Sequence, residues 1–223
     1  MATIKQALMQ ANTLQQVSES WKLDAELLLA EAIGQSREYL FTWPNKELTQ
    51  SQFEKFDTYC GRRLTGEPIA YILGRQAFWD FELLVNPAVL IPRPETELLV
   101  ETALELLDKS ATAVVLDLGT GSGAIALALA ANNRHWTVTA VDSSESALGV
   151  AADNAKLLQL SNIEFIQTKA RFTFKFNKKT KDIVTYDNLE MTKIIQNTAG
   201  LKRYVIVNVT YPYGYEGKQY SMT

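Results

Sequence analysis

The sequence has few of the features that mark a secreted, disulfide-bonded or membrane-spanning protein. Its 223 residues include a single cysteine, Cys60, which excludes an internal disulfide and is compatible with a reducing compartment. The chain does not begin with a basic segment followed by an apolar run, so we expect no signal peptide. No apolar stretch approaches the length that spans a membrane. These absences predict a cytoplasmic protein without a membrane partner.

Acidic residues become scarce in the last quarter of the chain. Residues 1–167 contain 12 Lys+Arg and 21 Asp+Glu, whereas residues 168–223 contain 10 and 4. The net charge therefore changes from −9 to +6 near residue 168, which indicates an atypical basic tail over 168–223. Because this tail has no recognisable nucleic-acid-binding motif, we interpret it as a solvated charged surface and expect no direct contact with nucleic acid.

Residues 1–75 instead contain apolar residues at helical spacing, separated by short breaks. One helix is expected to bury Leu23, Leu27 and Ala30, with Leu28 as a further candidate for the buried face, and to end at Gly34. Another helix is expected to begin after Thr49, where Gln52 completes a capping box. We predict a small helical bundle, with the aromatic residues of that second helix in its core: Phe53, Phe56 and Tyr59.

The pattern changes over residues 76–88, where aromatic and branched residues predict a β-hairpin linker. The segment L-I-P-R-P-E-T-E follows at 90–97, and Pro94 suits the first turn of a helix. Arg93, Glu95 and Glu97 have two interpretations. The acids can simply favour the helix start electrostatically, or the three residues can form the wall of a site, because this helix leads into the next strand. Their position alone leaves both interpretations open.

Residues 114–123, V-V-L-D-L-G-T-G-S-G, predict a buried strand, a glycine turn and the start of a helix. Such a turn delivers backbone N–H groups at a helix N-terminus. A second strand, 137–141, ends at Asp142, whose carboxylate can accept both hydroxyls of a ribose. The pattern predicts a nucleoside-cofactor site made of Asp117, Gly119, Thr120, Gly121, Ser122, Gly123 and Asp142.

The spacing of the glycines indicates which cofactor binds. Dinucleotide-binding loops read G-x-G-x-x-G, whereas this loop reads G-x-G-x-G and follows an acid, Asp117. An acid beside the loop suits the cationic groups of S-adenosylmethionine and disfavours a diphosphate. The residues therefore favour S-adenosylmethionine over NAD, and over a glycine turn that binds nothing. No metal site is predicted.

Four segments occur in an order that resembles the HemK/PrmC-type peptide chain release factor glutamine methyltransferases. They are G-E-P-I-A-Y-I-L-G at 66–74, L-I-P-R-P-E-T-E at 90–97, D-L-G-T-G-S-G at 117–123, and Asp142. The resemblance covers about residues 1–167. It implies an α/β fold: a helical domain over 1–75 that docks the release factor, then a Rossmann-like half over 89–167 that binds S-adenosylmethionine. Because residues 168–223 have room for about one further βαβ unit, we expect the sheet to be incomplete. The implied reaction is methylation of a glutamine side-chain nitrogen in a Gly-Gly-Gln motif.

Residues 168–223 do not continue this resemblance. The family grips the substrate amide with an Asn-Pro-Pro-Tyr motif after its fourth strand, and that motif is absent here. The tail predicts a helix over 188–196 and a strand over 204–208. Asn208 resembles the motif's asparagine only loosely, so it is a weak catalytic candidate.

Two hypotheses stay open: an active protein-glutamine methyltransferase, and a truncated or frame-shifted copy that at most binds cofactor or partner. We predict little or no methyl transfer.

Overall fold

The structure is a computed structural model that describes residues 2–107, 112–168, 176–177, 182–183 and 204–209. The chain forms two compact units, Met1–Arg75 and Gln76–Thr223. The helix predicted over 188–196 and most of the basic tail lie outside the described residues. Within the described part of the chain, no helix has both the length and the apolar character needed to cross a membrane.

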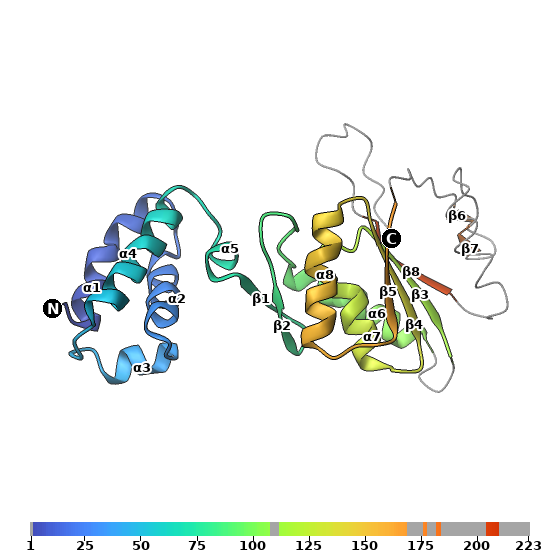
Figure 1. Ribbon diagram of the computed structural model, residues 1–223, viewed down its shortest axis with the longest axis horizontal. Helices are drawn as coiled ribbons and strands as arrows, with labels where there is room; N and C mark the ends of the chain where they lie inside the picture. Colours follow the sequence, from blue (N-terminus) through green and yellow to red (C-terminus); the bar gives the residue numbers. More distant parts are fainter. Residues whose placement is uncertain (1, 108–111, 169–175, 178–181, 184–203, 210–223) are drawn as a thin grey trace. The chain divides into compact units, whose positions relative to one another are not determined.

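The first unit is a bundle of short helices (Figure 1). Thr3 and Thr49 each begin a helix with a capping box, in which the threonine hydroxyl accepts from a backbone N–H and a glutamine side chain accepts from the threonine N–H. The helices in chain order are α1 (Ile4–Gln10), the 3-10 helix η1 (Ala11–Gln16), α2 (Trp21–Ile33), α3 (Arg37–Thr42), α4 (Gln50–Leu64) and α5 (Ile69–Leu73).

The buried face of α2 differs from the predicted one. Leu23 is 41% exposed, whereas Leu29, which was not expected there, is fully buried together with the candidate Leu28. The reason lies in Asp24, which shares a helix face with Leu28 and is buried because its carboxylate pairs with Arg63 of α4. A partnered aspartate therefore takes the inward position in the first turn, and the prediction that Leu23 is buried was wrong.

The aromatic residues of α4 lie in or against the core, as predicted. Phe56 is 3% exposed, and Phe53 and Tyr59 are partly buried against the same apolar cluster. Cys60 is buried beside them, and this burial raises the pKa of its thiol to about 12. Because a thiol with that pKa stays protonated near neutral pH, Cys60 is a packing residue rather than a nucleophile.

The second unit begins with a hairpin and continues into a parallel α/β sheet (Figure 1). The four strands run in the order β5-β4-β3-β8, all parallel. The elements are β1 (Arg75–Phe78), β2 (Phe81–Leu84), the 3-10 helix η2 (Pro94–Thr96), α6 (Glu97–Leu106), β3 (Val114–Leu118), α7 (Ala124–Asn132), β4 (Thr137–Asp142), α8 (Glu145–Leu157), β5 (Ile163–Gln167), the short strands β6 (Phe176–Asn177) and β7 (Asp182–Ile183), and β8 (Tyr204–Val209).

The sheet's central strand explains why this part of the sequence reads as continuously apolar. All five residues of β3 are buried, because β4 and β8 flank it and helices pack on it. Helices α6, α7 and α8 lie on one face of the sheet in Figure 1. Helix α7 is apolar nearly all round and lies inside the core, where seven of its nine residues are buried. This arrangement is the predicted Rossmann-like fold.

Candidate cofactor site

The glycine loop joins the carboxyl end of β3 to the start of α7. Its first two amides, those of Gly119 and Thr120, both donate to the carbonyl oxygen of Val141 in the neighbouring strand β4, at 2.8 and 2.9 Å. The Gly123 N–H donates to the Thr120 carbonyl oxygen at 2.8 Å and closes the turn. The loop therefore lies over the carboxyl edge of the sheet, where open α/β folds bind their ligands.

Two of the glycines are required for different reasons. Gly123 has φ +85°, and an added Cβ would lie 2.8 Å from Leu127 Cδ1 and 3.2 Å from Ala151 Cβ. It therefore lets α7 and α8 pack closely. Gly121 has φ +56°, but an added Cβ would meet nothing within 4 Å. The space that a side chain at this position would occupy is empty, which leaves room for a ligand against the backbone.

Asp142 ends β4, as predicted, and lies directly against the loop. One carboxylate oxygen accepts from the Gly121 N–H and the other from the Ser144 N–H, both at 2.9 Å. The carboxylate is half-buried, and each of its oxygens has a further lone pair. Two backbone amides thus fix the orientation of an acid that can still accept hydrogen bonds from a diol.

Asp117 lies beneath the loop, near the end of β3. Its side chain is fully buried, and one of its oxygens accepts from the Thr120 hydroxyl at 2.7 Å. Thr120 is 5% exposed, so this bond is shielded from water. The predicted loop residues and Asp142 are therefore all brought together at one edge of the sheet.

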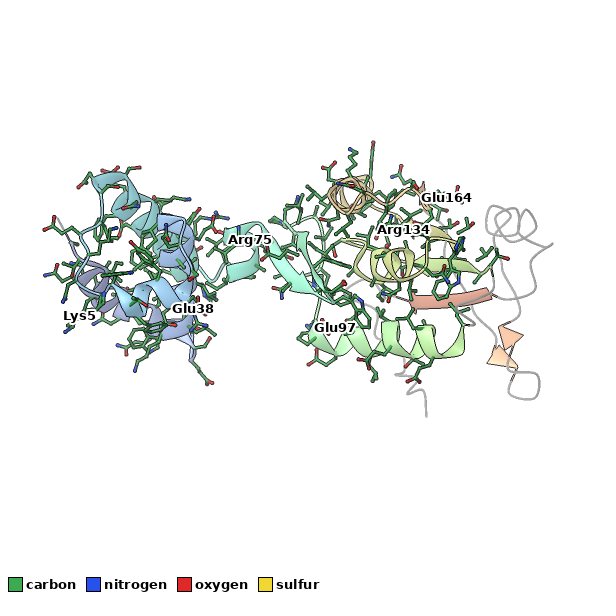
Figure 2. The ribbon with its side chains drawn as sticks, turned by 90° about the horizontal axis from the view of Figure 1, so that it is seen from below. Lys5, Glu38, Arg75, Glu97, Arg134 and Glu164 are labelled. Atoms are coloured by element: carbon green, nitrogen blue, oxygen red, sulfur yellow. The ribbon has the colours of Figure 1, made fainter. Side chains whose placement is uncertain are left out.

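The segment 93–97 is arranged differently. Arg93 and Glu95 are exposed, whereas Glu97 is half-buried at the start of α6. The Glu97 carboxylate accepts from the Trp79 N–H at 2.9 Å, in the two-residue turn of the hairpin, and Figure 2 labels Glu97 at this place. Trp79 has φ +59°, an uncommon conformation for a bulky residue. Glu97 therefore bonds the hairpin turn rather than the glycine loop.

A polar residue that the sequence analysis overlooked lies between the hairpin and the loop. Asn154 is 1% exposed in the middle of α8. Its amide bonds both backbone groups of Leu84 in β2 and the carbonyl oxygen of Ser122 in the loop. The available signal was an asparagine, a weak helix former, in an alanine-rich helix.

Asn208 lies in β8, which pairs in parallel with β3. The register shifts between Asp117 and Leu118, whose partners are Val207 and Val209. Asn208 is thus the additional residue of a bulge near the carboxyl end of β8, level with the end of β3 that leads into the glycine loop. Bulges of this kind are common beside active sites.

Chemically, these residues offer backbone amides, two carboxylates and open space above a glycine. The described residues contain no group of three His, Cys, Asp or Glu side chains that could hold a metal ion. The site suits a nucleoside whose hydroxyls donate to Asp142 and which carries positive charge, because the Asp117 and Asp142 carboxylates at the loop are hydrogen-bond acceptors. The donor set thus fits S-adenosylmethionine.

Comparison with known families matches the two units separately. Residues 6–74 match the PrmC N-terminal domain, and residues 115–205 match a methyltransferase domain. The second match begins in β3 and continues into β8, past the point at residue 167 where the predicted resemblance ends.

Relatives with curated names match across both units. The release factor glutamine methyltransferase of Coxiella burnetii is 49% identical over 166 residues, which cover 74% of this chain and 60% of the relative. That of Pseudomonas aeruginosa is 56% identical over 147 residues, covering 66% and 53%. The chain is a relative of the release factor glutamine methyltransferases. It spans between half and three fifths of the length of the relatives it matches.

A solved structure resembles the chain only slightly. It is the Pyrococcus abyssi tRNA (uracil-54, C5)-methyltransferase in complex with S-adenosyl-L-homocysteine, which is 25% identical, covers 43% of this chain and 23% of its own, and has a TM-score of 0.35.

Proposed function

We propose that the chain binds S-adenosylmethionine at the glycine loop and acts as a methyltransferase on the glutamine side-chain amide of a Gly-Gly-Gln motif in a peptide chain release factor. The observation that carries this proposal is the bond from the Gly121 N–H to the Asp142 carboxylate. It brings an open glycine and an oriented acid together at the carboxyl edge of the sheet. The names of the relatives support the choice of a release factor glutamine as substrate.

Several of the predicted residues have distinct roles in this proposal. When bound, S-adenosylmethionine supplies an electrophilic methyl group. Asp142 accepts from the ribose hydroxyls, Gly121 allows the ligand to approach the backbone, and Asp117 contributes negative charge beneath a cationic ligand. Arg93 and Glu95 form an outer wall, whereas one oxygen of Glu97 is already used by the hairpin turn.

The acceptor nitrogen needs its own holder, because the lone pair of an amide is delocalised and positioning must replace a strong base. We propose Asn208 for this role, since the bulge places it level with the end of β3. The cofactor loop then follows β3, and the acceptor residue lies in β8, the strand that pairs with β3.

The first unit is proposed to dock the release factor. It has an open apolar groove of about 350 Å³. The exposed apolar side chains Met9 and Phe41, 64% and 61% exposed, lie along it. Exposed apolar surface of this kind commonly marks a protein interaction site. The other residues that line the groove are Ile4, Lys5, Leu8, Trp21, Lys22, Ala25, Glu26, Leu40 and Pro44.

A second candidate function is cofactor binding with little or no methyl transfer. The absence of Asn-Pro-Pro-Tyr from the sequence favours it, because the chain then lacks the family's grip on the amide. The two candidates share the same cofactor site and differ only in the acceptor site.

Calorimetry tests the cofactor site. S-adenosylmethionine and S-adenosylhomocysteine are expected to bind, and NAD is not. Asp142→Ala is expected to weaken binding by roughly 1–3 kcal/mol, the cost of leaving polar partners unpaired. Exposed Asp153→Ala, on α8, is the matched control and is expected to bind as the unaltered chain does. Binding of NAD without a response to S-adenosylmethionine would overturn the assignment.

Incorporation of labelled methyl into a release factor bearing Gly-Gly-Gln, with a Gln→Ala substrate as control, separates the two candidates. The first candidate predicts glutamine-dependent incorporation, whereas the second predicts little or none. Robust glutamine-dependent transfer would reject the second candidate. Loss of that transfer in Asn208→Ala would then identify Asn208 as the residue that holds the acceptor.

A further inference from the structure

Asn154 forms a fully bonded bridge between two segments that are distant in the sequence. Its Oδ1 accepts from the Leu84 N–H at 2.6 Å, and its Nδ2 donates to the carbonyl oxygens of Leu84 and Ser122, each at 3.0 Å. Both amide hydrogens are therefore used. The Asn154 amide bonds the N–H and the carbonyl oxygen of Leu84, the last residue of β2, as a residue of a neighbouring strand would.

The bond to Ser122 controls the geometry of the glycine loop. The Ser122 carbonyl and the Gly123 N–H belong to one planar peptide group. Asn154 holds the carbonyl end of this group, and the Thr120 carbonyl oxygen accepts from its N–H end at 2.8 Å. The orientation of the peptide is thus fixed from both sides, and with it the direction of the loop before α7.

The bond to Leu84 fixes the hairpin beside the same loop. The hairpin's other fixed point is its turn, where Glu97 accepts from the Trp79 N–H at 2.9 Å. The strand β2 is therefore held at both ends by side chains of other elements. The Asn154 side chain thus links β2 directly to the glycine loop.

Packing alone does not explain an asparagine at this position. Ala151 and Ala155 of the same helix are buried near it, and alanine is a better helix former than asparagine. A buried amide is tolerated only where its hydrogen bonds are satisfied, as they are here. The free energy that offsets the low helix propensity of asparagine must therefore come from its hydrogen bonds to the two segments that it joins.

We propose that Asn154 is a positioning residue that couples the hairpin to the cofactor loop, so that a ligand on the loop also orders the backbone of β2 at Leu84. This inference rests on the proposed function, since the ligand is S-adenosylmethionine. Coupling of this kind is reciprocal: loss of the bridge weakens ligand binding, and ligand binding no longer protects β2.

Asn162 provides a matched control in the same unit. Its Nδ2 lies within 3.2 Å of three carbonyl oxygens, those of Ala130, Asn133 and Trp136, near the amino edge of the sheet. Asn154→Ala and Asn162→Ala each remove an asparagine with three hydrogen bonds. Both variants are expected to melt at a lower temperature, but they differ in their distance from the glycine loop.

The experiment measures the Kd for S-adenosylhomocysteine by calorimetry and amide hydrogen exchange by NMR, on the full chain. Asn154→Ala is expected to raise the Kd about tenfold, equivalent to one lost hydrogen bond in the loop, and Asn162→Ala to leave it unchanged. Saturation with the ligand is expected to slow exchange of the Leu84 amide in the unaltered chain and in Asn162→Ala, but not in Asn154→Ala.

An unchanged Kd in Asn154→Ala would overturn the inference and show that the residue has only a structural role. If Asn154→Ala does not fold, amide exchange in the unaltered chain is the test. A Leu84 amide whose exchange the ligand does not slow would reject the coupling. If the unaltered chain does not bind the ligand, the proposed function fails. In that case, amide exchange without ligand is compared between the unaltered chain and Asn154→Ala. Unchanged exchange at Leu84 and Gly123 in the variant would overturn the proposal that Asn154 joins these two segments.

Discussion

Several polar side chains of the two units differ in the kind of group that they bond. In the first, charged side chains pair with one another across elements: Arg63 of α4 with Asp24 of α2 at 2.9 Å, and Arg37 of α3 with Glu26 of α2. In the second, Asp142, Asn154 and Asn162 bond backbone groups. Side-chain pairs fix how helices lie against each other, whereas side chains on backbone groups fix the shape of loops. The second unit is thus built to hold loops, as a ligand site requires.

The largest expected effect tests the helical core of the first unit. Phe56→Ala should destabilise the fold by about 3–5 kcal/mol, because the ring is 3% exposed and its removal leaves a cavity. Equilibrium urea unfolding, followed by amide exchange in α2, measures the loss. Phe41→Ala, at an exposed aromatic residue, is the control and should change stability by less than about 0.5 kcal/mol. A loss that small for Phe56 itself would contradict its place in the core.

The ion pairs of the first unit should differ in strength according to burial. Asp24→Ala should cost about 3 kcal/mol of unfolding free energy, because Arg63 is then left nearly buried without its partner. Glu26→Ala breaks the more exposed pair with Arg37 and should cost less than about 1 kcal/mol. Thermal and urea unfolding of the two variants make the comparison. Equal losses would show that burial does not decide the strength of these pairs.

The smallest effect concerns glycines of the second unit and should have opposite signs at two positions. Gly123→Ala should destabilise by about 1–3 kcal/mol, because of its positive φ and the contact with Leu127. Gly149→Ala, in the exposed middle of α8 with nothing within 4 Å of the added Cβ, should stabilise by about 0.5–1 kcal/mol. Differential scanning calorimetry gives both signs. A stabilising Gly123→Ala would mean that the loop does not need this backbone conformation.

The same contrast explains which features could be predicted from the sequence. Patterns of adjacent residues predicted the bundle, the strand before the glycines and the position of Asp142, because those features depend on local periodicity and turn chemistry. The buried position of Asp24 was not predictable in this way, because it depends on Arg63, 39 residues away. Asn154 was missed for the same reason, since its partners lie 70 and 32 residues away.

The pairing of β8 with β3 shows a further limit of prediction from the sequence. The segment 204–208 was predicted as a strand from its branched residues, and β8 covers Tyr204–Val209. Its pairing with β3, and the bulge that contains Asn208, depend on register and could not be inferred from the segment alone. The role of Asn208 is a prediction that the methyl-transfer assay tests, and the wall roles of Arg93 and Glu95 stay predictions.

The shared carbonyl of Val141 has a consequence for the entropy of binding. Because one oxygen of β4 accepts from two successive loop amides, the first half of the loop is ordered by the sheet before any ligand arrives. A ligand that meets a preorganised backbone does not have to immobilise it, so less of its contact free energy is lost to ordering. Binding at this loop should therefore be accompanied by a small conformational entropy change, unlike the larger change expected for a site on a loop that its ligand must fold.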